Sequence, residues 1–340
     1  SVTLTDDPSY GDALWHGIQL YNKAGDTARV IAALELFVGE RPDDAITPEA
    51  LLQLGQAYQA AGLFDKAIGA FSKNRFLHPN SLGALKSAVP LAMSYLAKGP
   101  EFYKRAEAVL KSVVEDNPAV TPKAAEFRES LFELARLYYR TDRYEESIAR
   151  LEELCQRYPE EPRMAQLVFL MADSYRKSAN VLDARVAAVG DGPAAGAVDA
   201  AEVLKAKRDR LARARELYDR VIELFRSAAP QEETDKLNLK LSFFYRADCV
   251  FDLGNYDEAI KLYDAAAFRY QEDPSALAAY VQIVNAYCAL GKTEEAKAAN
   301  ERAKWLLRRM PPEAFQQGAF NMPRQYWEQW LKWSGEAGMW

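Results

Sequence analysis

Residues 51–79 read LLQLGQAYQAAGLFDKAIGAFSKNRFLHP, and two later stretches repeat the same order of small, bulky and turn residues. Residues 131–159 read LFELARLYYRTDRYEESIARLEELCQRYP, and residues 243–271 read FFYRADCVFDLGNYDEAIKLYDAAAFRYQ. We number each unit so that its quoted stretch begins at place 4. Place 8 is then small (Gly55, Ala135, Ala247), and place 15 is a turn residue (Gly62, Asp142, Gly254). Such a recurrence predicts a repeat array.

The same register continues along most of the chain. Units start near residues 11, 48, 85, 128, 165, 240 and 277, most often 37 residues apart. Small residues at places 8 and 20 let two helices approach, and bulky residues at places 4, 7, 11, 24 and 27 fill the space between them. The turn residue at place 15 ends the first helix, and a proline ends the second in several units (Pro42, Pro79, Pro118, Pro159). We therefore predict an all-α protein in which the stacking of helix pairs supplies the core.

The second unit resembles the tetratricopeptide-repeat family closely. It matches the family pattern at places 7, 8, 11, 20, 24 and 32 with Leu54, Gly55, Tyr58, Ala67, Phe71 and Pro79. The resemblance covers residues 11 to about 310 and implies a right-handed superhelical solenoid of about seven helix pairs. The 37-residue period and the segment 149–159 look most like bacterial envelope-associated members of the family.

Two segments depart from the repeat. Residues 176–213 lengthen the fifth unit, and we predict that they extend its helices into a projecting hairpin whose second helix has about 28 residues. The glycine-rich segment 190–196 lacks the context of a phosphate-binding loop and is predicted to be the hairpin tip. We expect residues 1–310 to form the solenoid and residues 311–340 a tryptophan-rich capping helix. The alternative for this last helix is an aromatic surface for a partner.

Composition and charge limit the classes of function that the chain can have. The net charge is −6, and the charged residues are mixed along the chain, which argues against nucleic acid as a partner. No apolar run is long enough to cross a membrane, so we predict no membrane insertion by this segment. The chain opens at Ser1 without an initiator methionine, and we expect further sequence before it. The three cysteines are predicted to be small core residues.

No catalytic motif is recognisable. The sequence has two histidines, His16 and His78, and neither belongs to a metal-binding or nucleophile motif. Acidic pairs such as Glu152-Glu153 are predicted to be solvated helix faces. We therefore predict a protein that is not an enzyme and that requires no cofactor or metal.

The resemblance implies that the first helices line a concave groove, with places 2, 5, 9, 12 and 13 pointing into it. Place 5 is apolar in every unit and place 9 is polar in all but one, which suits an extended or helical peptide. The predicted groove residues are Trp15, Gln56, Phe132, Arg136, Tyr139, Arg140, Phe169, Asp173, Arg176, Phe244, Asp248 and Asn285. The alternative is that the place-5 residues pack between neighbouring units.

The charge of this groove is predicted to be uneven. Arg136, Arg140, Arg176 and Lys177 fall in units four and five, whereas Asp248 and Asp252 fall in unit six. A ligand with an acidic end near unit four and a basic end near unit six would be complementary. Place 5 holds no lysine, so the carboxylate clamp of the family's chaperone-tail binders is not expected.

The leading hypothesis is a non-enzymatic scaffold that binds a peptide or protein segment in this groove. One alternative is a regulatory or anchoring portion of a larger envelope-associated multidomain protein. Another is an RNA-binding helical repeat, which the net charge disfavours. The sequence leaves both a cytoplasmic and a periplasmic or cell-envelope location open, and it does not name the partner.

Overall fold

A computed structural model of the chain describes residues 8–115, 120–189, 195–316 and 322–336. For residues 8, 183–189, 195–200 and 333–336 it describes the backbone alone. The residues within these ranges form helices and connections, without a strand. The chain divides into two compact units, Ser1–Arg143 and Tyr144–Trp340, and each is described by itself.

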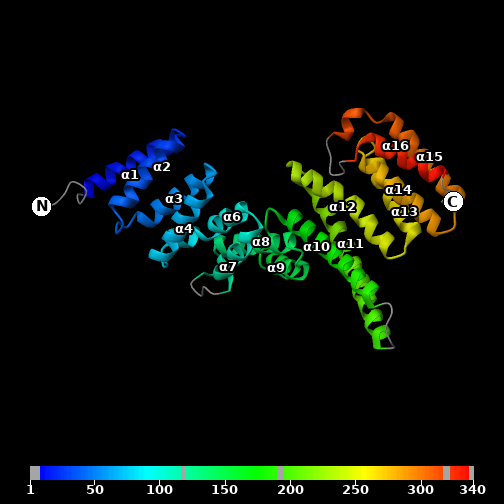
Figure 1. The fold of residues 1–340 in the computed structure, drawn as a ribbon, viewed down its shortest axis with the longest axis horizontal. Coiled ribbons are helices and arrows are strands. Elements are labelled where there is room, and N and C mark those ends of the chain that lie inside the picture. The colour runs from blue at the N-terminus through cyan, green and yellow to red at the C-terminus, as the bar shows by residue number, and fades with distance from the viewer. Residues whose placement is uncertain (1–7, 116–119, 190–194, 317–321, 337–340) are drawn as a thin grey trace. The chain divides into compact units, whose positions relative to one another are not determined.

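The first unit contains four helix pairs or parts of pairs, coloured blue to cyan-green in Figure 1. Its helices are α1 (Pro8–Lys23), α2 (Thr27–Glu40), α3 (Thr47–Ala60), α4 (Phe64–Leu77), α5 (Leu82–Lys86), α6 (Ala88–Lys98), the short 3-10 helix η2 (Pro100–Phe102), α7 (Tyr103–Val114) and α8 (Ala125–Arg140). Each long helix packs on the next one along the chain, as expected of stacked repeats.

The second unit contains the longest helices. They are α9 (Tyr144–Arg157), α10 (Met164–Val189), α11 (Ala195–Ser227), α12 (Glu233–Asp252), α13 (Tyr256–Arg269), α14 (Ser275–Ala289), α15 (Thr293–Arg309), the 3-10 helix η3 (Pro312–Phe315) and α16 (Arg324–Glu336). Here too, sequential helices pack on each other, and α16 packs on α15. The predicted all-α fold of about seven helix pairs followed by a terminal helix is confirmed.

The lengthened pair is formed by α10 and α11, which pack along each other. Figure 1 shows this pair extending past the ends of α9 and α12. The helix has 33 residues, more than the roughly 28 predicted, and spans about 50 Å. The predicted tip falls partly on residues 190–194, which lie outside the described residues. The division of the chain into a 1–310 solenoid and a 311–340 cap stays a prediction.

The turns of the second and fourth units have the backbone that the sequence predicts. Gly62 has a φ of 73°, and Asp142, the non-glycine residue at this place, has a φ of 58°. Glycine reaches this left-handed region without steric cost, and aspartate reaches it more easily than most residues do. In these two units, place 15 therefore ends the first helix as expected.

The first helix of the third pair is divided, which the sequence analysis does not predict. It ends as α5 at Lys86 and resumes as α6 at Ala88. Pro90 has no N–H to donate to the carbonyl of Lys86, so the continuous helical ladder is interrupted at this point. Ser87, between the two helices, donates its hydroxyl hydrogen to the carbonyl of Gly83, 2.7 Å away.

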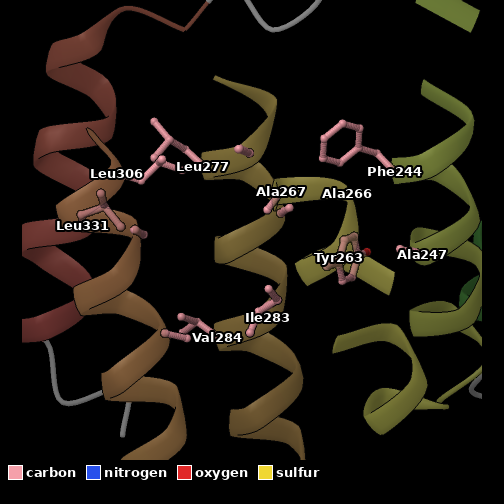
Figure 2. Packing of buried hydrophobic residues seen from close by; sticks show 14 of the residues in the cluster. Phe244, Ala247, Tyr263, Ala266, Ala267, Leu277, Ile283, Val284, Leu306 and Leu331 are labelled. Carbon is pink, nitrogen blue, oxygen red and sulfur yellow. The ribbon is translucent and has the colours of Figure 1, made fainter. Parts of the chain in front are cut away.

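One buried apolar cluster of the second unit runs from α12 to α16, and Figure 2 shows part of it. Alanines at places 8 and 20, Ala247 and Ala259, are fully buried and allow close helix approach. Trp327 and Leu331 of α16 belong to the same buried cluster. Asn300 on α15 also donates its side-chain N–H to the carbonyl of Leu331, 3.3 Å away. The terminal helix thus covers apolar side chains of the last pair.

Candidate functional site

The predicted groove residues near the N-terminus differ in exposure. Trp15 is half-buried and lies against Phe37, with 5.7 Å between ring centroids. Gln56 is exposed and lines a polar pocket of about 350 Å³ with Asn22 and Glu49. Of these two residues, Gln56 has the more accessible side chain.

Helix α8 carries four of the predicted residues. Phe132 is buried, with 9 % of its surface exposed, whereas Tyr139 is half-buried. Arg136 is exposed and lies over the Phe132 ring at 5.5 Å, with its guanidinium 3.0 Å from Glu133. Arg140 is also exposed and donates to the hydroxyl of Tyr103, 2.7 Å away. The two arginines present charge at the surface, while Phe132 contributes to packing.

The aspartates at place 9 of units five and six each accept a hydrogen bond from a tyrosine. Tyr218 occupies place 24 of its unit and donates its hydroxyl to Asp173, 3.1 Å away. Tyr263 occupies the same place in the next unit and donates to Asp248, 2.6 Å away. In both pairs, a core tyrosine on the second helix therefore reaches the groove-side aspartate on the first.

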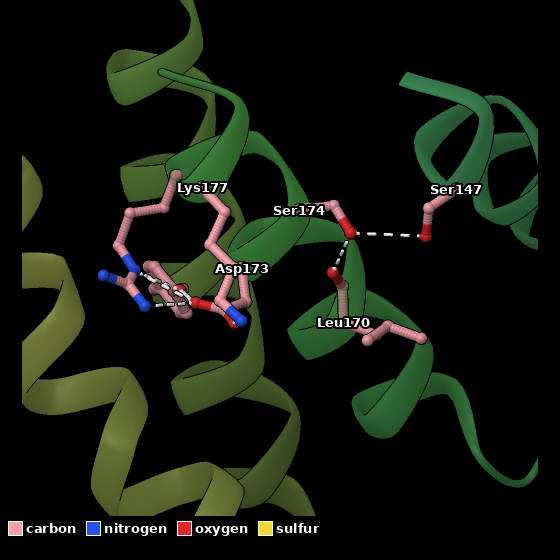
Figure 3. Close-up of polar contacts among 7 residues, drawn as sticks. Ser147, Leu170, Asp173, Ser174 and Lys177 are labelled. Carbon is pink, nitrogen blue, oxygen red and sulfur yellow. Dashed lines mark hydrogen bonds and ion pairs between the residues drawn. The ribbon is translucent and has the colours of Figure 1, made fainter. Parts of the chain in front are cut away.

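Asp173 is enclosed by partners, as Figure 3 shows. Only 4 % of the residue is exposed. Besides Tyr218, it contacts the guanidinium of Arg176 at 2.5 Å and the amine of Lys177 at 3.8 Å. Arg176 in turn lies 4.0 Å from the ring centroid of Tyr245. Asp173 and Arg176 thus neutralise each other inside the unit.

The predicted basic cluster falls in both units. Arg136 and Arg140 belong to the first unit, whereas Arg176 and Lys177 belong to the second. Their grouping into one basic surface stays a prediction. Within the second unit, the ion pair with Asp173 means that Arg176 is not a free positive charge.

Asp248 lies in a different setting, in the wall of a pocket of about 380 Å³. The pocket is lined from α10, α12, α13, α14 and α16, and its members include Arg176, Phe244, Tyr245, Asp248, Tyr263, Val281, Gln282, Tyr326, Trp327 and Trp330. Phe244, a predicted groove residue, is buried, with 4 % exposed. Asn285 lies one turn beyond Gln282 and donates to its side-chain oxygen, 2.9 Å away.

The surroundings of Asp248 disfavour the ionised form of its carboxyl group relative to the protonated form. Burial raises the pKa of Asp248 to about 6, although the hydrogen bond from Tyr263 acts in the opposite direction. Burial also raises the pKa of Tyr263, and the neighbouring charge of Asp248 adds to this effect. A carboxylate with so raised a pKa beside a pocket is a candidate binding group.

The predicted groove did not include the aromatic residues of this site. Place 24, which Tyr218 and Tyr263 occupy, is predicted to serve packing, and Tyr245, Tyr326 and Trp330 are not among the predicted groove residues. Phe169, which was assigned to it, is half-buried against Tyr218, with 5.9 Å between ring centroids. In both units, tyrosine at place 24 accompanies aspartate at place 9. This combination is the feature of the sequence that indicates the two hydrogen-bonded pairs.

Other kinds of site are not found in the described part of the chain. It contains no group of three or more His, Cys, Asp or Glu side chains placed to hold a metal ion. Among its helices, none combines the length and the apolar character needed to cross a membrane. Of the three cysteines, Cys249 is buried and Cys155 and Cys288 are half-buried.

Comparison with known proteins identifies the repeat. A family model described as tetratricopeptide repeat matches residues 49–81 and 129–161, and a second model of the same description matches residues 241–276. No match was found among curated proteins.

Several solved structures are similar to the chain at low sequence identity. A tetratricopeptide repeat protein from Parabacteroides merdae is 12 % identical, with a TM-score of 0.48, and the match covers 95 % of this chain and 97 % of that one. MamA protein is 15 % identical, with a TM-score of 0.43 and coverage of 65 % and 97 %. BtubC from P. vanneervenii is 15 % identical, with a TM-score of 0.43 and coverage of 83 % and 96 %.

Proposed function

Three segments of the chain are tetratricopeptide repeats, which generally serve as protein-interaction modules, and from this we propose that the protein is a non-enzymatic scaffold. It binds a peptide or protein segment along the groove formed by the first helices of its pairs. The observation that carries the proposal is the match of the repeat itself in both compact units.

The surface of the first helices supports this proposal. Gln56, Arg136 and Arg140 are exposed polar residues on α3 and α8. In the second unit, the pocket beside Asp248 combines apolar and polar walls. Peptide grooves use this combination, because apolar pockets anchor side chains while polar groups bind the peptide backbone.

The resemblance to bacterial envelope-associated members of the family stays a prediction. An anchoring role in a larger envelope-associated protein would still use these helices for protein binding. We therefore keep protein binding as the proposed activity and leave the location of the protein open.

Site-specific photo-crosslinking tests the proposal. A photoreactive amino acid replaces Gln56, Arg136 or Gln282 on the first helices, one at a time, in cells of the source organism. We expect each position to form covalent adducts with a shared, small set of proteins, because all three lie on the first helices that line the proposed groove. Mass spectrometry identifies the adducts.

Matched positions on second helices provide the control. Lys73 on α4 and Lys261 on α13 are exposed, and we expect them to yield few or none of the same adducts. Equal adducts from first and second helices, or crosslinks from the first helices to RNA alone, would refute the proposed groove.

A further inference from the structure

We propose that the pocket beside Asp248 binds a basic side chain, arginine or lysine, of the partner segment. This inference rests on the proposed function, because it assigns a subsite within the same groove. The occupant is chosen from the charge balance of the pocket, the chemistry of its walls and its position on the first helices.

The charge balance favours a cation. Arg176 and Asp248 both line the pocket, but Arg176 is paired with Asp173 at 2.5 Å. Asp248 instead accepts a hydrogen bond from the neutral hydroxyl of Tyr263. The charge of Asp252, one turn further along α12, raises the pKa of Asp248, whereas the charge of Arg176 lowers it. Because Arg176 is held by Asp173, a partner's ammonium or guanidinium group complements the carboxylate of Asp248 in the pocket wall.

The aromatic walls suit the same occupant. Tyr326 is 43 % exposed and Trp330 is half-buried, so both rings offer surface at the pocket. A cation gains from lying over such a ring, most of all over tryptophan, and the methylene stem of arginine or lysine packs on apolar surface. The unit already contains one example of this contact, between Arg176 and Tyr245.

The position of the pocket favours a side chain that belongs to a bound segment. Phe244, Asp248 and Val281 line it, and they occupy places 5 and 9 of the last two units. A peptide that follows the first helices would thus pass over the pocket opening. One long basic side chain could enter while the peptide backbone stays in the groove.

The raised pKa of Asp248 gives the subsite a pH dependence. The groups that face its carboxyl are Tyr263 from α13, Arg176 and Asp173 from α10, and Asp252 from its own helix. Burial has the largest effect and brings the pKa to about 6. The ionised carboxylate pairs with a cation and the protonated form does not, so binding is expected to weaken as the pH falls through about 6.

The test uses the full chain and capped pentapeptides that carry alanine at every position except the centre. The central residue is arginine, lysine, norleucine or glutamate. We expect the arginine and lysine peptides to bind at pH 7.5 at least about tenfold more tightly than the other two. Tryptophan fluorescence follows the titrations, because Trp327 and Trp330 line the pocket.

Two variants assign the effect to this pocket. Asp248→Asn keeps an acceptor for Tyr263 but removes the charge, and it should abolish the preference for the basic peptides. Gln282→Lys leaves Asp248 in place, adds a competing cation to the pocket wall and should have the same result. Asp264→Asn is the matched control, because Asp264 is exposed and lines a different pocket on α13 and α15, so the preference should persist.

Three results would overturn the inference: no binding of the basic peptides, equal binding of norleucine and arginine peptides, or an unchanged preference in Asp248→Asn. Circular dichroism confirms that each variant is folded before it is titrated. The crosslinks from Gln56 and Arg136 test the proposed function independently, because both positions lie in the other unit. Failure of the pentapeptides with successful crosslinks would remove the subsite alone.

Discussion

At the scale of the residue, Gly55 and Phe71 set the distance between α3 and α4. A Cβ atom at Gly55 would lie 2.4 Å from Cε1 of the Phe71 ring, which is too close for two carbons. Phe71 itself is fully buried, so its ring has little room to move. Other units tolerate alanine at the same place, as Ala135 and Ala247 show.

We therefore expect Gly55→Ala to destabilise the first unit, even though alanine is the better helix former. Overpacking of a close-packed core costs about 1–3 kcal/mol. Urea denaturation followed by circular dichroism measures the effect. Gly69→Ala on α4 is the control, because a Cβ at Gly69 meets nothing within 4 Å. It should stabilise the protein by about 0.5–1 kcal/mol, and a similar gain for Gly55→Ala would contradict the argument.

At the scale of the element, α16 depends on its buried face. Leu331 is 2 % exposed and Trp327 is 5 % exposed, and both pack with the residues of α14 and α15. Arg324 adds a hydrogen bond to the carbonyl of Met310, 3.0 Å away. A terminal helix of this kind protects the apolar end of a repeat array from water.

Leu331→Ala is expected to lower the stability of the second unit by about 2–5 kcal/mol, because it leaves a cavity where a buried leucine was. Chemical denaturation monitored by tryptophan fluorescence reports the change. The control is Glu328→Ala, whose side chain is 53 % exposed and forms an ion pair with Arg324 at 3.0 Å. Its effect should stay within about 1 kcal/mol. If both variants lose equal stability, α16 does not stabilise the last pair through Leu331.

At the scale of the whole molecule, the chain consists of two compact units built from sequential helix contacts. In such an array, a helix contacts mainly its neighbours, so a local defect has a local effect. In the proposed function, the ligand-binding positions are distributed along helices of both units.

We expect hydrogen exchange to reveal this locality. In Gly55→Ala, exchange should rise in α3, α4 and the helices packed on them, while α14 and α15 keep the protection of the wild type. Leu331→Ala should have the reverse pattern. Mass spectrometry of peptic fragments measures both variants. A uniform rise along the chain in either variant would indicate a single cooperative unit instead.

Structural features that depend on residues nearby in the chain were predictable from the sequence. The turn at Gly62 follows from the conformational freedom of glycine, and the burial of Ala67 and Phe71 follows from their spacing. The division between α5 and α6 also follows from a nearby residue, Pro90. It was not predicted, because the repeat pattern treats this segment as one helix. Phe132 and Phe244 were assigned to the groove because place 5 is apolar, yet an apolar side chain does not itself indicate whether it faces a ligand or a neighbouring helix.

The sequence by itself determined the helix pairs, their turns and their order, because each depends on residues within one or two turns of helix. Only the tertiary structure decided which polar groups form hydrogen bonds and ion pairs with each other. Asp173 and Asp248 occupy the same place in their units, but Arg176 neutralises the first, while the second lies in an aromatic pocket completed by α16. That difference arises from side chains on several helices, up to about 80 residues away along the chain. The charge balance at each aspartate depends on which of these side chains lie close to it in space, and the folded structure decides this.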